Sequence, residues 1–166
     1  GQTREVTAMT TAELPTSDPT VVLSGAQEAL AQLVSEKSKG STIRIWSVGC
    51  SKGQEAYSVA IMISELLQER VSHYKIQIFA TDIDSDSLHF ARKGIYKKEH
   101  LETMPENLLE KYFEKTGDDF EVKKEIRQWV LFSKHDITVD PPFVRLDLIL
   151  CRNLLIYFNN ELQRET

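Results

Sequence analysis

The chain has 166 residues, of which 41% are hydrophobic and 27% charged, and a formal net charge of −5. This length and composition predict one globular domain with a sizeable core, and they exclude collagen-like, low-complexity and disulfide-scaffold proteins. The acidic balance argues against nucleic acid as a partner. No apolar run approaches the roughly 18–20 residues of a membrane helix, and two cysteines suit a reducing compartment, so we expect a cytoplasmic protein without membrane insertion.

The first elements in chain order are a lead-in, a helix and a strand. Residues 1–23 are rich in threonine and lack periodicity, so we expect a mobile lead-in. A capping-box pattern at Ser24 and Gln27 predicts the start of a helix that ends near Gly40. The apolar run at 43–48 predicts a buried strand.

The next elements continue an alternating pattern of strands and helices. Ser51 and Gln54 form a second capping pattern ahead of a helix, and a strand is expected at 76–81. Asp84 or Ser85 can cap a short helix that Gly94 closes. This alternation predicts an α/β fold, the front half of a doubly wound parallel sheet.

The part from about 95 to 132 has a different character and predicts a small α+β insert. A helix is expected from about 103 to 113, a turn at 117–119, and extended segments at 120–122 and 129–132. A last short strand follows at 147–151, and Asn159 starts a helix. We therefore expect a core over 24–166 whose sheet is cut short on its far side, with an exposed edge that could form a dimer.

Glycines and an acid follow the first predicted strand. Gly49 and Gly53 allow a ligand to approach the backbone, and Glu55 in the first helical turn suits a cationic ligand or one with free donors rather than a phosphate. The alternative is a tight turn in which Glu55 only offsets the helix dipole. The spacing differs from the G-x-G-x-x-G pattern, and the next strand-end acid, Asp82, lies 29 residues beyond Gly53, which argues against a third interpretation, a nicotinamide-dependent dehydrogenase.

Polar residues also follow the other predicted strands. Asp82 is placed to accept both hydroxyls of a ribose, although an acid there could instead cap the next helix. Asp136 follows a strand where adenine is commonly bound, and Arg152 and Asn153 end the last strand. Because ligands bind at the carboxyl edge of such sheets, these positions predict a nucleoside-sized ligand. The four histidines show no metal-ligand spacing, so no metal is expected.

Four ordered motifs then resemble one family, the CheR-type chemotaxis receptor methyltransferases. They lie at 43–59 (IRIWSVGCSKGQEAYSV), 78–84 (IFATDID), 91–96 (ARKGIY) and 151–158 (CRNLLIYF). Residues 140–147 (DPPFVRLD) are most similar to the version found in methylesterase/methyltransferase fusion signalling proteins. The resemblance implies a Rossmann-like class I methyltransferase fold and methyl transfer from S-adenosylmethionine to receptor glutamates, with S-adenosylhomocysteine as product.

The resemblance also implies a role for individual residues. Gly49 lines the loop, Glu55 faces the amino group of the methionine moiety, and Asp82 takes the ribose hydroxyls. Adenine is assigned to Asp136 and Ile137, and the region beside the sulfonium to Asn153 and Leu154. Arg152 and Tyr157 are candidates for orienting the acceptor carboxylate. The substrate is then the cytoplasmic domain of a chemoreceptor or another signalling protein.

One departure from the family pattern keeps a second interpretation open. Family members carry a T-x-F-F-R motif ahead of the core, whereas residues 9–18 read MTTAELPTSD, with no aromatic pair and no arginine. The alternative to an enzyme is therefore a non-catalytic module that binds the nucleoside or transmits signals within a larger protein.

Overall fold

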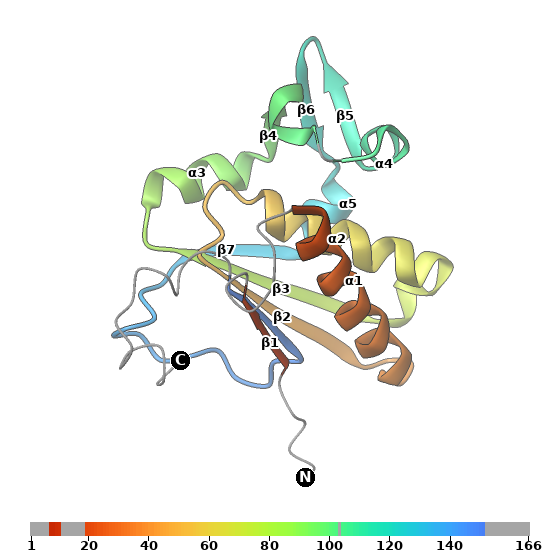
Figure 1. Cartoon of the computed structure of the whole chain (residues 1–166), viewed down its shortest axis with the longest axis vertical. Helices are drawn as coiled ribbons and strands as arrows, with labels where there is room; N and C mark the ends of the chain where they lie inside the picture. The colour runs from red at the N-terminus through yellow and green to blue at the C-terminus, as the bar shows by residue number, and fades with distance from the viewer. Residues whose placement is uncertain (1–6, 11–18, 103, 152–166) are drawn as a thin grey trace.

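Two β-sheets organise the chain in the computed structural model, which describes residues 7–10, 19–102 and 104–151. The large sheet has five strands that pair in parallel (Figure 1): β1 (Thr7–Thr10), β8 (Leu148–Cys151), β2 (Thr42–Val48), β3 (Lys75–Asp82) and β7 (Val130–Lys134), in that spatial order. The small sheet is antiparallel, in the order β4 (Ile95–Lys97), β6 (Asp119–Val122) and β5 (Phe113–Thr116).

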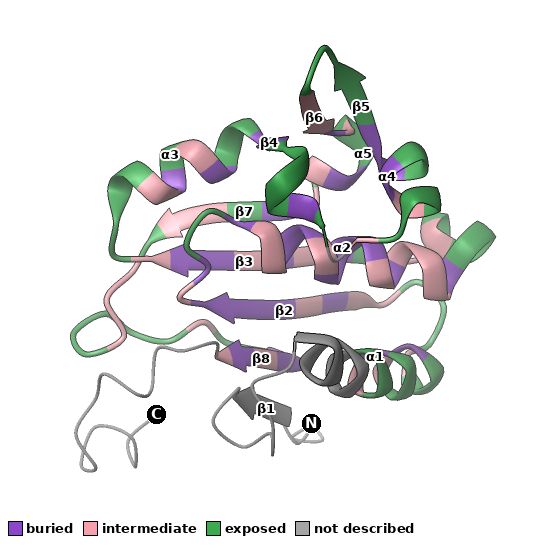
Figure 2. Cartoon of the chain, turned by 45° about the horizontal axis from the view of Figure 1, so that its top comes forward, coloured by how far each residue is buried: buried purple, intermediate pink, exposed green. Residues whose placement is uncertain are grey.

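The helices cover one face of the large sheet. The long ones, α1 (Pro19–Glu36) and α2 (Gln54–Leu67), lie in front of the sheet, and α3 (Ser85–Lys93) follows β3 (Figures 1 and 2). The short ones are η2 (Gln68–His73), η3 (Lys98–Leu101), α4 (Glu106–Tyr112) and α5 (Lys124–Arg127). Parallel strands joined through helices make this a Rossmann-like α/β fold, as the sequence predicts.

The main core lies between the large sheet and its helices. Ile43, Ile45 and Ile78 of the central strands are fully buried, as are Ala60 and Ile63 of α2. A strand inside a parallel sheet is covered on both faces, which is why the apolar runs at 43–48 and 76–81 read as continuous rather than alternating. The structure confirms both strands.

The opposite face of the sheet has a second, smaller core. Trp46, Val48 and Leu146 are buried there, and partly buried side chains pack against them: Phe79, Ile137, Phe143, Ile149 and Cys151. In the described part of the chain this cover comes from the loop between β7 and β8 rather than from a helix. That loop therefore begins at the carboxyl end of β7 and packs on this face of the sheet.

The start of the chain differs from the predicted lead-in over 1–23. Residues 7–10 form β1, which pairs with β8, and α1 begins at Pro19 rather than at Ser24. β1 thus covers the edge of β8 that the sequence leaves unpaired. An edge strand presents unsatisfied N–H and C=O groups, and a nearby extended segment lowers the free energy by pairing with them.

Helix α2 begins at Gln54, after Gly53, and not at the capping pattern of Ser51. The φ angle of Gly53 is +89°, and a Cβ there would meet the Cβ of Ala91 at 2.9 Å and the Phe132 ring at 3.0 Å. The left-handed conformation and the close approach both require glycine. Tertiary packing against α3 and β7, rather than a side-chain cap, decides where this helix starts.

The insert holds an antiparallel hairpin of β5 and β6, with β4 beside it. Of these strands only β6 matches an expected extended segment, the one at 120–122; β5 forms where the sequence predicts the end of a helix. The helix expected over 103–113 is α4, which ends at Tyr112 because Phe113 enters β5; Thr103 lies outside the described residues. The extended segment at 129–132 pairs with β3 in the large sheet, although the predicted insert reaches residue 132. The helix expected from Asn159 also lies outside the described residues.

Asp84 caps α3, and Gly94 ends it in a left-handed conformation, as predicted. Among the described residues, no helix is both long and apolar enough to span a lipid bilayer.

Candidate functional site

The loops that carry the predicted site residues lie along one edge of the large sheet. In Figure 2 the arrowheads of β2, β3, β7 and β8 point the same way, so the carboxyl ends of these strands lie together. Gly49 follows β2, Asp82 ends β3 and Asp136 follows β7. Residues from distant parts of the sequence thus meet at the position where open α/β sheets bind ligands.

The carboxylate of Asp82 connects two of these loops. Its Oδ2 accepts the backbone N–H of Ser51 at 2.8 Å, from the loop after β2, and its Oδ1 accepts that of Asp84 at 2.9 Å, from the loop after β3. Each carboxylate oxygen can accept a further hydrogen bond. Asp82 can therefore hold the two loops together and still accept hydrogen bonds from a pair of ligand hydroxyls.

The loop after β2 is held open by glycine and by backbone hydrogen bonds. Gly49 adopts a positive φ of 69°, Cys50 N donates to the Thr81 carbonyl at 2.9 Å, and Gly53 N donates to the Cys50 carbonyl at 2.9 Å. Without a Cβ at residue 49, a ligand can approach the backbone of this loop. The N-terminus of α2 follows directly.

Glu55 lies in the first turn of α2 and is partly exposed. Its charge and that of Asp82 both act on the buried thiol of Cys50. The pKa of this thiol is raised to about 12, mainly by burial, next by Asp82 and least by Glu55. Two predicted site acids, 27 residues apart in the sequence, therefore lie close to one cysteine. This concentration of negative charge suits a cationic ligand.

Asp136 and Ile137 lie in the loop after β7. The Asp136 carboxylate accepts the hydroxyl of Thr138 at 2.6 Å and its N–H at 2.9 Å, and these bonds lower the pKa of the carboxyl. The backbone N–H of Asp136 donates to the Asp140 side chain at 2.8 Å. Ile137 packs against the second core. The loop thus has a defined shape before any ligand binds.

The remaining predicted site residues, Asn153 and Leu154 with the catalytic candidates Arg152 and Tyr157, lie outside the described residues. Strand β8, which leads to them, ends at Cys151 on the same edge of the sheet, next to Val48 of β2.

Two residues at this edge were not singled out by the sequence analysis. The Tyr96 hydroxyl, from the small sheet, donates to the Lys52 carbonyl at 2.6 Å in the loop after β2. The backbone N–H of His135 donates to the Asp82 carbonyl at 3.1 Å. Tyr96 does lie in the motif at 91–96, but neither residue has a spacing that would predict these contacts.

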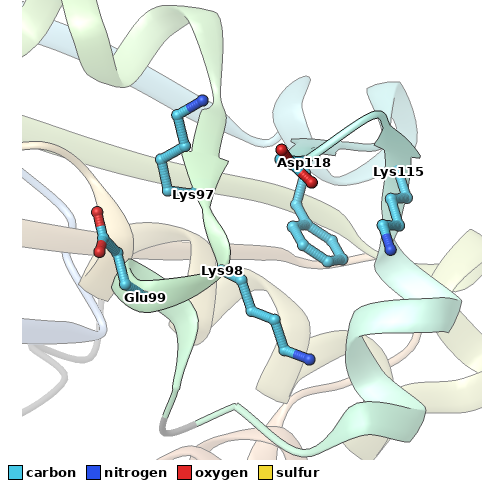
Figure 3. A pocket seen from close by; sticks show the side chains of 6 residues that line it. Lys97, Lys98, Glu99, Lys115 and Asp118 are labelled. Atoms are coloured by element: carbon cyan, nitrogen blue, oxygen red, sulfur yellow. The ribbon is translucent and has the colours of Figure 1, made fainter.

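A pocket of about 330 Å³ lies elsewhere, on the small sheet (Figure 3). Its lining residues come from β4, η3, β5, β6 and the turn between β5 and β6: Lys97, Lys98, Glu99, Lys115, Asp118 and Phe120. None of the predicted site residues is among them. Within the described parts of the chain, no three His, Cys, Asp or Glu side chains gather as a metal site would require.

Comparison with known proteins gives the family. Residues 21–166 match the family described as "CheR methyltransferase, SAM binding domain". A chemotaxis protein methyltransferase of Borreliella burgdorferi is 40% identical over 127 residues, which are 75% of this chain and 45% of that protein. That of Escherichia coli is 35% identical over 131 residues, covering 74% of this chain and 44% of that protein.

A third relative is much longer. An uncharacterized 104.1 kDa protein of Rhodobacter capsulatus is 35% identical over 146 residues, which are 88% of this chain and 15% of that protein. The chain therefore spans less than half the length of these three relatives. Its fold, the edge where its acids meet and the match over 21–166 agree: the chain belongs to the CheR methyltransferase family, within the S-adenosylmethionine-binding domain.

Proposed function

We propose that this chain is the cofactor-binding core of a protein-glutamate O-methyltransferase that modifies chemoreceptors or related signalling proteins. The observation that supports it most is the position of Asp82, whose carboxylate joins the loops after β2 and β3 at the carboxyl edge of the sheet. The relatives named as chemotaxis protein methyltransferases support the same reaction.

In this proposal the site residues have separate tasks. Asp82 accepts the ribose hydroxyls, Gly49 allows the ligand to approach the backbone, and Glu55 faces the ammonium group of the methionine moiety. Asp136 and Ile137 hold the adenine. Asn153 and Leu154 lie beside the sulfonium. An edge rich in acids fits S-adenosylmethionine, which carries two positive centres and no phosphate.

The reaction demands little acid–base chemistry from the protein. When bound, S-adenosylmethionine supplies an electrophilic methyl group. A glutamate carboxylate is already ionised at neutral pH, since its ordinary pKa is about 4.3, so no general base is required. The protein contributes by aligning the acceptor and by excluding water. In this role Arg152 and Tyr157 orient the acceptor carboxylate.

The partner is a signalling protein that presents glutamates. The pocket on the small sheet supports this choice, because lysines that attract carboxylates, Lys98 and Lys115 among them, line it (Figure 3). The acids Glu99 and Asp118 line it as well. A cytoplasmic location follows from such a substrate. A dimer through an exposed edge of the large sheet is a further part of the proposal, to be checked by analytical ultracentrifugation.

The first test is calorimetric titration of the chain with S-adenosylhomocysteine. We expect binding by the wild type and a loss of at least about tenfold in Asp82→Ala, because hydrogen bonds to a charged group contribute about 1.5–3 kcal/mol. Asp86→Ala, an acid in the first turn of α3, is the matched control and should bind as the wild type does. No binding by the folded wild type would contradict the proposed cofactor site.

The alternative is a module that binds the nucleoside without catalysis, which residues 9–18 favour because they lack the family's arginine. A methylation assay on the full-length parent protein separates the two. Methyl transfer to a chemoreceptor fragment supports the enzyme, whereas binding without transfer supports the module.

A further inference from the structure

The imidazole of His135 connects the loop after β7 with the second face of the large sheet. Its ring makes a T-shaped contact with Trp46 at a centroid distance of 5.2 Å and an interplanar angle of 81°, and it stacks on Phe143 at 5.4 Å and 28°. Such aromatic contacts orient a ring as well as bury it. The ring of His135 is therefore held against residues of β2 and of the β7–β8 loop.

One ring nitrogen closes the loop. Nε2 lies 2.9 Å from the Pro141 carbonyl oxygen. Because a carbonyl oxygen can only accept, Nε2 carries the hydrogen of this bond. The other nitrogen, Nδ1, is buried and has no hydrogen-bond partner among the described residues. Among the described residues, the imidazole thus makes its hydrogen bond through the Nε2 donor.

The segment closed in this way carries the two residues proposed to hold adenine. His135 N donates to the Asp82 carbonyl, and Asp140 N donates to the Asp136 carbonyl at 2.8 Å. The His135–Pro141 bond spans the same turn from the outside. Asp136 and Ile137 therefore lie within a closed turn that is attached at one end to the strand carrying Asp82.

We infer that His135 is a positioning residue, which holds the turn at 136–140 in the shape that receives adenine without touching the ligand itself. This inference rests on the proposed function. A preordered loop loses less conformational entropy when the ligand binds, so affinity increases without a new contact. Removing the Nε2 donor should weaken nucleoside binding even though Asp136 and Ile137 are unchanged.

The test compares two substitutions of this one side chain in the full chain. His135→Phe keeps the stacking ring and removes the donor, whereas His135→Gln keeps an N–H donor at a similar position and removes the ring. We expect the Kd of S-adenosylhomocysteine to rise about fivefold in His135→Phe, as one lost hydrogen bond of ordinary strength allows, and to stay within about twofold in His135→Gln. His100→Phe, at an exposed histidine of η3, is the control.

A second measurement separates positioning from overall stability. Amide hydrogen exchange of Thr138 and Asp140, whose N–H groups bond to Asp136, should be faster in His135→Phe without ligand, while the urea midpoint stays near that of the wild type. An unchanged Kd in His135→Phe, with binding by the wild type intact, would overturn the inference alone. Equal losses in both His135 variants would overturn the donor as the cause. No binding by the wild type would overturn the proposed function and, with it, this inference.

Discussion

At the scale of single residues, Lys37 after α1 and Asp147 before β8 make a buried ion pair. Lys37 Nζ lies 2.8 Å from Asp147 Oδ1, and both side chains are 6% exposed. Lys37 also donates to the Thr42 carbonyl, and Asp147 Oδ2 accepts the backbone N–H of Arg44 at 2.9 Å. The pair thus connects the end of α1 with β2 and with the residue before β8.

We expect Asp147→Ala to lower the free energy of unfolding by about 3–5 kcal/mol, because Lys37 then keeps a buried charge without this partner. The double variant Lys37→Met/Asp147→Leu should recover part of the loss, since an apolar pair replaces a buried ion pair at little cost, while the Arg44 N–H and the Thr42 carbonyl lose their side-chain partners. Urea unfolding of both variants measures this. A double variant as unstable as Asp147→Ala would contradict the argument.

The thiol of Cys50 allows a test of the site's charge. With its pKa raised to about 12, Cys50 is almost entirely in the thiol form at pH 8, and the thiolate is the reactive form. In a Cys151→Ser background we expect Cys50 to react with a disulfide reagent far more slowly than a free cysteine. Glu55→Gln removes a negative charge that raises this pKa, so it should increase the rate. If Cys50 reacts at the same rate in Glu55→Gln, the charge of Glu55 does not reach the loop after β2, and Glu55 is too far away to contact a ligand bound there.

At the scale of elements, α3 depends on its capping residue. The Asp84 carboxylate accepts the Ser87 hydroxyl at 2.7 Å and the Asp86 N–H at 3.1 Å, and these bonds lower the pKa of Asp84. A carboxyl whose folded pKa is depressed stabilises the protein above its unfolded pKa of about 3.9, and this contribution is lost as the pH falls through the folded value.

We therefore expect wild type to be more stable than Asp84→Asn at pH 7, with the difference vanishing below the folded pKa of Asp84. Urea midpoints measured from pH 7 down to pH 2.5 give both curves. Asp118→Asn, in the turn between β5 and β6, controls for the loss of a surface carboxylate. A difference that persists at the lowest pH would show that Asp84 does not act through its charge.

The elements themselves could largely be predicted from the sequence. Strands β2 and β3 are apolar runs of buried type, and the cap and stop signals of α3 lie at Asp84 and Gly94, where the structure has them. The exceptions depend on distant partners. α2 starts after Gly53 because of Ala91 and Phe132, and β1 forms because β8 offers it an edge. No local pattern of sequence contains that information.

At the scale of the whole molecule, the small sheet is attached to the site by one buried tyrosine. Tyr96 is 1% exposed, its ring meets those of Tyr57 and Phe90 edge-on, and its hydroxyl donates to Lys52 in the loop after β2. Tyr112 makes a comparable bond, to the Ser64 hydroxyl of α2 at 3.0 Å, away from that loop.

Tyr96→Phe should lower the free energy of unfolding by about 1–2 kcal/mol, because it leaves the Lys52 carbonyl without this donor, and it should also weaken binding of S-adenosylhomocysteine. Tyr112→Phe should cost similar stability and leave binding unchanged. Urea unfolding and calorimetry on both variants test this. Equal affinities in the two variants would show that the small sheet does not support the loop.

The candidate site likewise has a part that the sequence predicts and a part that it does not. Residue type and position after a strand were enough to single out Gly49, Glu55, Asp82 and Asp136, because the carboxyl ends of parallel strands always share one edge. The contacts that hold the loops of these residues in place could not be predicted. The contacts of Tyr96 with Lys52 and of His135 with Pro141 and Trp46 join residues whose approach depends on the packing of two sheets and a long loop.

By itself, the sequence determined the α/β class, the order of the elements and the edge where acids gather, since these follow from periodicity, capping residues and the position of polar groups after apolar runs. Only the tertiary structure decided which backbone groups Asp82 holds, where α2 begins, how β1 covers β8 and how His135 closes its turn. These depend on distances between segments far apart in the chain, and such distances are set by the packing of the whole core.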